Sequence, residues 1–187
     1  MKITTILGSP KKKGNTNAVL EQFEKIVEKD HTIDRINIKD KTVNGCLGCG
    51  ACRKKPDQIG CVQKDDAVSI FERMVDSDLI IYATPLYCWG FTAQLKALID
   101  RHFCMVKAFA PPEEHISLLE KKKIALLVTC GGPVENNTEP IQTSFEKLGF
   151  YIKGEIAGKF ILPLCADINA AKTEGAKLAK QMAESLV

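Results

Sequence analysis

Apolar residues recur with two different spacings along this chain, and the alternation of the two spacings predicts the order of its elements. Short continuous apolar runs, typical of buried strands, occur at 3–7, 33–38, 79–83, 124–129 and 155–162. In the intervening segments apolar residues return every three or four positions, as on one face of a helix; the first such set is Val19, Leu20, Phe23, Ile26 and Val27. This alternation predicts an α/β fold with a five-stranded parallel sheet covered by helices on both faces.

Residues that favour helix starts stand where several of these helical series begin. One of the two aspartates at 65–66 precedes one series, Thr92 precedes another and Thr138 a third, and the last series begins near Asn169. Short polar side chains of this kind accept hydrogen bonds from the unpaired N–H groups of a first helical turn. No repeat or low-complexity linker divides the series, so we expect residues 1–187 to form a single doubly wound domain.

Composition narrows the class of protein. Hydrophobic residues make up 45% of the 187 residues, which is enough for the core of one domain. The net charge of +3 comes from lysines spread along the chain, and aromatic content is only 6%, which together argue against a nucleic-acid partner. The sequence shows neither a signal-peptide pattern nor an apolar run long enough to span a bilayer, so we expect a cytoplasmic protein without a membrane partner.

The turn between the first predicted strand and the first predicted helix has the composition of a phosphate site. A helix N-terminus offers unpaired N–H groups to an anion, and hydroxyl, amide and ammonium groups gather around this one. The candidate ligands are Ser9, Lys11, Asn15, Thr16 and Asn17. The chain lacks both the Gly-x-x-x-x-Gly-Lys-Ser/Thr loop of nucleoside triphosphate sites and the Gly-x-Gly-x-x-Gly pattern of dinucleotide sites, so a terminal monophosphate is favoured. The alternative is an ordinary turn with solvated lysines.

Two more loops follow predicted strands and would reach the same edge of the sheet, because the carboxyl ends of parallel strands lie together. One loop contains Pro85, Leu86, Tyr87, Cys88, Trp89 and Gly90, and the other contains Cys130, Gly131 and Gly132. Aromatic side chains beside glycines, whose backbone allows close approach, suit a flat ligand. The alternative for the two aromatic residues is that they close the hydrophobic core.

As a set, these motifs resemble those of a known family. They are Gly8-Ser9-Pro10 with Gly14-Asn15-Thr16, Thr84-Pro85-Leu86-Tyr87 with Gln94-Leu95-Lys96 and Asp100-Arg101, and Cys130-Gly131-Gly132. The set is similar to that of the flavodoxin-like NAD(P)H-dependent FMN reductases and, within them, of the iron-sulfur flavoproteins. The resemblance covers nearly the whole chain and implies a strand order of 2-1-3-4-5.

The resemblance also implies a cofactor, its site and its reaction. It places the FMN phosphate on the five ligands of the first turn and the isoalloxazine ring between residues 85–90 and 130–132. Backbone N–H groups of residues 87–90 and 131–132 would then stabilise the reduced, anionic flavin. Lys11 stands where the family usually has Arg. A lysine ammonium group offers the phosphate a single charge in place of the two parallel hydrogen bonds of a guanidinium group, and we expect FMN binding to survive the change. The implied reaction transfers electrons from NAD(P)H or reduced ferredoxin through the flavin to a small-molecule acceptor.

Four further cysteines follow the second predicted strand in a glycine-rich loop, residues 45–61. They are Cys46, Cys49, Cys52 and Cys61, with the spacing Cys-x2-Cys-x2-Cys-x8-Cys. In a cytoplasmic protein such clustering favours metal or redox chemistry over disulfides, and the short gaps let three thiolates surround one 4Fe-4S cluster. The pattern resembles the compact motif of the iron-sulfur flavoproteins, but the insertion at 54–57 lengthens its last gap and leaves the fourth ligand open. Redox-active thiols without a cluster and structural zinc are the alternatives.

The remaining residues of chemical interest carry more limited expectations. Two other cysteines lie in the flavin loops, whereas Cys104 and Cys165 are predicted core thiols. We assign no catalytic acid or base, and His102 is predicted to be packed or surface-facing. The apolar segment 106–119 is predicted to form the interface of a homodimer or homotetramer.

Two other functions compete with an enzyme. A metal or redox sensor could use the cysteine loop without catalysis, but it would leave the three converging loops unexplained. A receiver-type binding module needs an acidic pair at the end of the first strand, where this chain has Gly8, Ser9 and Pro10. The sequence therefore favours an FMN-dependent oxidoreductase, and its most specific interpretation adds a 4Fe-4S cluster.

Overall fold

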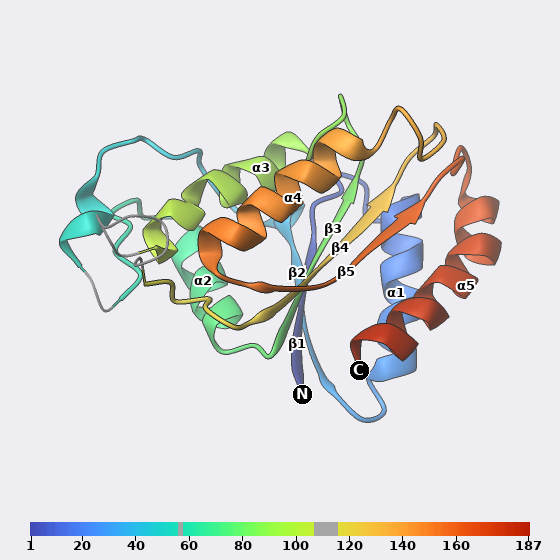
Figure 1. Cartoon of the computed structure of the whole chain (residues 1–187), viewed down its shortest axis with the longest axis horizontal. Helices are drawn as coiled ribbons and strands as arrows, with labels where there is room; N and C mark the ends of the chain where they lie inside the picture. The colour runs from blue at the N-terminus through green and yellow to red at the C-terminus, as the bar shows by residue number, and fades with distance from the viewer. Residues whose placement is uncertain (56–57, 107–115) are drawn as a thin grey trace.

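The computed structural model describes residues 1–55, 58–106 and 116–187, which form an α/β fold (Figure 1). Within these residues five parallel strands form one sheet in the order β2-β1-β3-β4-β5, which confirms the predicted order. The strands are β1 (Lys2–Leu7), β2 (Thr32–Asn37), β3 (Leu79–Pro85), β4 (Lys123–Thr129) and β5 (Glu155–Leu162). The helices are α1 (Asn15–Val27), α2 (Ala67–Val75), α3 (Ala93–Asp100), α4 (Glu139–Ile152) and α5 (Ile168–Leu186), with short 3-10 helices at Ile38–Asp40, Ala51–Lys54 and Arg101–Met105.

Helices cover both faces of the sheet, as the alternation predicted. In Figure 1, α1 and α5 lie together on one face, and α2, α3 and α4 lie on the other. Side chains of β1 alternate between the two cores: Ile3 and Leu7 pack with residues of α1 and α5, whereas Ile6 packs with residues of α2 and α3. The central strand β3 is buried from Leu79 to Thr84 because both of its faces are covered, which accounts for its continuous apolar run.

The strand order creates a ligand crevice at the carboxyl end of β1. The chain crosses from β1 through α1 to β2 on one side, and then from β2 through α2 to β3 on the other side of β1. Doubly wound sheets bind ligands where connections diverge in this way. The strand ends are also level, because Leu7 pairs with Ala83 and Pro85 pairs with Thr129. The loops after β1, β3 and β4 therefore meet at one edge.

Helix starts agree with the sequence in part. Thr92 Oγ1 accepts a hydrogen bond from the first turn of α3, as predicted. Asp65 bonds the first turn of α2, and Asp167 caps α5 close to the predicted start at Asn169. Thr138 precedes α4 but forms no cap, because its hydroxyl donates to a carbonyl of the preceding loop. Over the described residues, no helix combines the length and the apolar content that crossing a bilayer requires.

Two sequence predictions reach beyond the described residues. Pro56 and Asp57, in the insertion of the cysteine loop, lie outside them. So do residues 107–115, which make up most of the segment 106–119 predicted as a subunit interface. The position of that interface stays a prediction.

Candidate functional site

An open pocket lies at the carboxyl edge of the sheet; we call it the edge pocket. It is lined by Ser9, Lys11, Lys13, Gly14, Asn15, Thr16, Pro85, Leu86, Tyr87, Thr129, Cys130, Gly131, Cys165 and Ala166. Its empty space is about 720 Å³ with its open mouth included. The three loops singled out in the sequence thus converge on one pocket, together with the loop after β5.

The first turn of α1 is suited to an anion. Its N-cap residue is Gly14, which has no side chain to bond the first-turn N–H groups, so these groups remain available to a ligand. The hydroxyls of Thr16 and Thr129 lie 2.7 Å apart and share one hydrogen bond. Ser9 Oγ accepts a hydrogen bond from the N–H of Lys11 (3.2 Å), which tightens the turn. Hydroxyls, an ammonium group and backbone N–H groups therefore surround this helix terminus.

The two asparagines of the turn are directed to different places. Asn15 Nδ2 donates to Cys165 O (2.8 Å) and ties the turn to the loop after β5. Asn17 is not among the residues that line the edge pocket, because its Oδ1 accepts a hydrogen bond from Arg35 of β2. Its side chain lines a neighbouring hollow with Glu24 and Arg35 instead. The side chain of Asn17 therefore does not line the edge pocket in this structure.

The loop after β3 contributes its first half to the edge pocket. Residues 85–87 line the pocket, and the chain then makes a tight turn. Tyr87 and Gly90 exchange two backbone hydrogen bonds (3.2 and 3.0 Å), and Cys88 and Trp89 between them have left-handed backbone, with φ of 46° and 60°. Such backbone costs residues other than glycine about 1–2 kcal/mol each. Trp89 is 60% exposed, so the alternative in which it closes the core is wrong.

Two buried thiols border the edge pocket. Cys130 follows β4, Cys165 lies in the loop after β5, and the N–H of Cys165 donates to Cys130 O (2.8 Å). Burial raises the pKa of both thiols, and the charge of Asp167 adds to the rise at Cys165, so both stay protonated at neutral pH. Gly131 lines the pocket with open space beside its Cα, whereas Gly132 packs against a following asparagine side chain and does not line it.

Five residues of the edge pocket were not among the site residues predicted from the sequence: Lys13, Gly14, Thr129, Cys165 and Ala166. The signal for the last two was present, because they follow the fifth predicted strand, whose carboxyl end shares the edge with the others. Thr129 was recognised as the end of a strand, but its hydroxyl enters the site only through the contact with Thr16. No local pattern reports such a contact.

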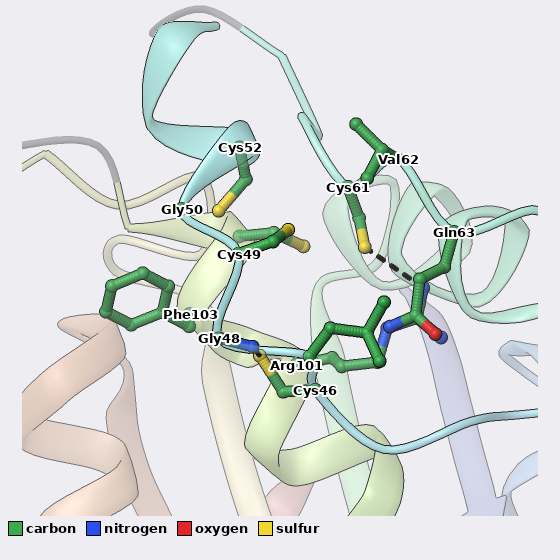
Figure 2. Close-up of a pocket in the computed structure, with 12 residues that line it drawn as sticks. Cys46, Gly48, Cys49, Gly50, Cys52, Cys61, Val62, Gln63, Arg101 and Phe103 are labelled. Atoms are coloured by element: carbon green, nitrogen blue, oxygen red, sulfur yellow. Dashed lines mark hydrogen bonds between the residues drawn. The ribbon is translucent and has the colours of Figure 1, made fainter.

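A second pocket lies near the carboxyl end of α3 (Figure 2); we call it the cysteine pocket. It is lined by Cys46, Leu47, Gly48, Cys49, Gly50, Cys52, Cys61, Val62, Gln63, Arg101, Phe103 and Cys104. The four cysteines of the predicted loop therefore meet in one place. They are joined there by Cys104, which sequence reasoning assigned to the core. All eight cysteines of the chain lie in the described residues, and none forms a disulfide.

The cysteine pocket fits a metal centre by the chemistry of its donors. Figure 2 shows the side chains of Cys49, Cys52 and Cys61 around the same pocket, while Cys46 Sγ accepts a hydrogen bond from the N–H of Gly48 (3.5 Å). Across the described ranges, no three His, Cys, Asp or Glu side chains already stand as a metal-binding group. Soft thiolates on a loop that turns at two left-handed glycines (φ 63° and 68°) are the donors that iron-sulfur and zinc centres use.

Packing closes the long gap before Cys61. Gly60 lies so close to Cys52 that a Cβ added to it would stand 2.7 Å from Cys52 O. At the neck of the loop, Asp65 Oδ2 accepts hydrogen bonds from the backbone (2.9 Å) and the side chain (3.3 Å) of Asn44. The two ends of the loop are thus held together, and the eight-residue gap returns Cys61 to the other cysteines.

His102 lines neither pocket. Its Nε2 lies 2.8 Å from the Tyr82 hydroxyl and its Nδ1 lies 3.0 Å from Leu98 O, within the core. Burial lowers the pKa of His102 to about 4, so the ring is neutral at neutral pH. Of the two positions that the sequence left open for it, the structure selects the packed one.

Related sequences share part of this chain. An iron-sulfur flavoprotein from Methanosarcina thermophila is 43% identical over 102 residues, which cover 54% of this chain and 52% of that protein. One from Archaeoglobus fulgidus is 39% identical over 102 residues, which cover 54% of this chain and 45% of that protein. This chain thus spans about half the length of the iron-sulfur flavoproteins that it matches.

Structural likeness extends further along the chain than sequence likeness. The NAD(P)H:quinone oxidoreductase from Methanothermobacter marburgensis superposes with a TM-score of 0.76 at 19% identity, over 100% of this chain and 99% of that one. At this level of identity the likeness shows the fold alone. The family match is more specific, because residues 1–144 match the NADPH-dependent FMN reductases and include the turn before α1, the cysteine loop and the loops after β3 and β4. This chain therefore belongs to the NADPH-dependent FMN reductase family.

Proposed function

We propose that this chain is an FMN-dependent oxidoreductase that takes electrons from NAD(P)H or reduced ferredoxin and passes them to a small-molecule acceptor. The observation that carries the proposal is the edge pocket, where an uncapped helix N-terminus and hydroxyls lie beside an apolar wall. FMN has the matching parts, a terminal phosphate and a flat ring joined by a polyol. Membership of the NADPH-dependent FMN reductase family supports the same cofactor.

In this proposal the first turn of α1 holds the phosphate. Ser9 and Thr16 supply hydroxyls, Lys11 supplies a positive charge, and the backbone N–H groups of residues 15–17 add donors at the positive end of the helix dipole. Asn15 has a different task, because its amide group holds the loop after β5 against the turn.

The flavin ring would lie between residues 85–87 and Gly131. Leu86 and Tyr87 offer apolar surface, and beyond its chain neighbours nothing lies within 4 Å of the position that a Cβ on Gly131 would take, so the ring could approach the backbone there closely. The redox chemistry is that of the flavin, which accepts two electrons and can release them singly. Backbone N–H groups at this position favour the anionic reduced state, and the protonated thiols of Cys130 and Cys165 add no opposing charge.

We also propose that Cys46, Cys49, Cys52 and Cys61 ligate a 4Fe-4S cluster. All four line one pocket, and the relatives from M. thermophila and A. fulgidus, which match 54% of this chain, are iron-sulfur flavoproteins. A cluster carries one electron at a time, so beside a flavin it would let the protein divide electron pairs taken from NAD(P)H. Zinc or uncomplexed thiols are the outcomes that would replace it.

A homodimer or homotetramer is the proposed working form. Three large apolar side chains are exposed in the loops that form the edge pocket. Tyr87, which lines the pocket, is 47% exposed; Trp89 in the same loop is 60% exposed, and Leu164, next to Cys165 in the sequence, is 66% exposed. Exposed large apolar side chains near a site are consistent with a surface that another subunit covers. Light scattering at micromolar concentration should give at least the mass of a dimer, and the mass of a monomer would contradict the assembly.

The absorption spectrum of protein purified without oxygen tests the function directly. Flavin and iron-sulfur centres absorb differently, so one spectrum reports both. NADH or NADPH should bleach the flavin band, and a soluble quinone should restore it. Protein that contains no flavin and takes up none in an FMN titration would overturn the proposed activity, whereas flavin with zinc in place of iron would overturn only the cluster.

A further inference from the structure

A buried cation is built into the cysteine pocket. Arg101 stands in the 3-10 helix that follows α3, and its side chain is only 1% exposed. Its guanidinium pairs with the equally buried Asp65, donates from Nη1 to Asn44 O (3.3 Å), and donates from Nη2 to Cys61 Sγ (3.2 Å), the last contact being drawn in Figure 2. One side chain therefore contacts both the neck of the cysteine loop and one of its thiols.

A purely structural role does not explain the hydrogen-bonding of Arg101. A buried ion pair is favourable only when its hydrogen-bonding groups are satisfied, and Nε of Arg101 has no partner among the described residues. Another of its N–H groups is directed at a sulfur atom, which is a weak acceptor as a neutral thiol. A thiolate that ligates a metal is negatively charged and accepts a much stronger hydrogen bond. The arrangement therefore suits a protein whose Cys61 is a ligand.

The contact also bears on which thiol is the fourth ligand. Cys61 follows the long gap of the motif, and Cys104 lines the same pocket as a fifth thiol. Cys104 is 3% exposed and belongs to the hydrophobic core on the α2–α4 face. Arg101 donates a hydrogen bond to the sulfur of Cys61, which is only partly buried. The cation thus marks Cys61 among the candidates.

We propose that Arg101 is the positioning residue of the cysteine centre: it holds Cys61 as the fourth ligand in preference to Cys104 and places a fixed positive charge against the centre. The inference rests on the proposed metal site. Hydrogen bonds to ligand sulfur and a nearby positive charge both stabilise the more negative, reduced state of an iron-sulfur centre. Arg101 therefore raises the midpoint potential of the centre as well as its affinity for metal.

The test uses the full chain and two readouts. Co²⁺ bound by thiolates gives a charge-transfer absorption band, so a Co²⁺ titration measures the site without a cluster, and a redox titration of reconstituted protein measures the potential. Because Arg101→Gln alone would leave Asp65 buried without its partner, the variant is Arg101→Gln combined with Asp65→Asn, and FMN binding in the edge pocket reports that the fold is intact. We expect Co²⁺ affinity to fall about 10- to 100-fold and the midpoint potential to become more negative.

Matched variants separate positioning from stability. Arg101→Lys keeps the charge and should return the potential toward that of the wild type, which a mere loss of packing would not do. Arg73→Gln breaks a part-buried arginine pair with Asp34, away from the cysteines, and should change neither readout. Cys61→Ala should abolish tight Co²⁺ binding, and Cys104→Ala should retain it.

Each outcome decides a different point. If the double variant Arg101→Gln/Asp65→Asn had the Co²⁺ affinity and the midpoint potential of the wild type, the role of Arg101 would be overturned and the proposed function would stand. The same conclusion would follow if Cys104→Ala lost the metal and Cys61→Ala retained it. A wild type that binds Co²⁺ in an Arg101-dependent way but takes up no iron and sulfide would overturn the cluster and support the positioning role. If the wild type bound neither Co²⁺ nor iron, both the proposed cluster and the positioning role of Arg101 would be overturned.

Discussion

Thr16 links the fold and the proposed ligand through one hydroxyl. The hydroxyls of Thr16 and Thr129 share a single hydrogen bond, so one of their two protons stays available to a phosphate oxygen. We expect Thr16→Val, which keeps the shape and removes the hydroxyl, to weaken FMN binding about 10- to 100-fold, the effect of losing a hydrogen bond to a charged group worth about 1.5–3 kcal/mol. Fluorescence titration with FMN measures the change. Thr143→Val, on the exposed face of α4, is the control, and equal dissociation constants in the two variants would remove Thr16 from the site.

His102 makes the stability of the chain depend on pH. Its pKa is about 4 in the folded protein and about 6.5 when unfolded, so between these values the unfolded chain binds a proton that the folded chain excludes. The contribution is fully present above pH 6.5 and is lost as the pH falls toward 4. Urea unfolding should therefore show a free energy of unfolding about 2 kcal/mol lower at pH 5 than at pH 7, since each pH unit in this window contributes about 1.4 kcal/mol.

The matching variant for this effect is His102→Gln, which cannot titrate. Its own stability is expected to be lower at both pH values, because the contacts with Tyr82 and Phe71 are altered. Burial raises the pKa of Glu24, which therefore contributes to the pH dependence of both proteins alike, and the effect of His102 is the difference between wild type and variant. Asp34 and Asp65 do not obscure the comparison, since hydrogen bonds from arginines lower the pKa of both carboxyls and move their titration below this window. The same loss of stability in His102→Gln as in the wild type would assign the effect to another group.

At the scale of elements, the cysteine loop depends on one close backbone contact. A Cβ on Gly60 would stand 2.7 Å from Cys52 O and 2.9 Å from Cys52 Cα, so Gly60→Ala must push the segment before Cys61 away from the rest of the motif. Gly45→Ala is the control, because nothing lies within 4 Å of the position that its Cβ would take. We expect Gly60→Ala to lose iron, or Co²⁺ used in its place, while Gly45→Ala binds like the wild type. Equal metal binding in both would show that the contact does not position Cys61.

The elements were predictable from the sequence because their signals are local. Apolar runs located each strand close to its observed bounds, and the rule for parallel strands brought three loops to one edge. The direction of single side chains within those loops was not predictable. Asn17 is held aside by a hydrogen bond from Arg35 of β2, and the Thr129 hydroxyl enters the site through its contact with Thr16; both pairings join residues far apart in the sequence. Periodicity does not contain such tertiary contacts.

At the scale of the whole molecule, α3 lies between the two pockets. Thr92 at its start donates from Oγ1 to Gly8 O (2.7 Å), in the turn after β1, and Arg101 beyond its end contacts the cysteine pocket. An eight-residue helix is about 12 Å long. In the described part of the chain, the residues that line one pocket do not line the other. Each pocket can therefore be disturbed without altering the lining of the other.

This separation leads to the expected behaviour of Cys49→Ala. Removing one thiolate should make a 4Fe-4S cluster labile, while the turn before α1 and the loops after β3 and β4 keep their geometry, so iron and sulfide should be lost and the dissociation constant for FMN should stay unchanged. Iron and sulfide assays after anaerobic reconstitution, with an FMN titration of the same samples, measure both quantities. Cys88→Ala, which changes a cysteine outside the cysteine pocket, should retain iron, sulfide and flavin. Fewer than about one iron per wild-type chain would rule out the cluster, and loss of FMN together with iron in Cys49→Ala would show that the two pockets are coupled after all.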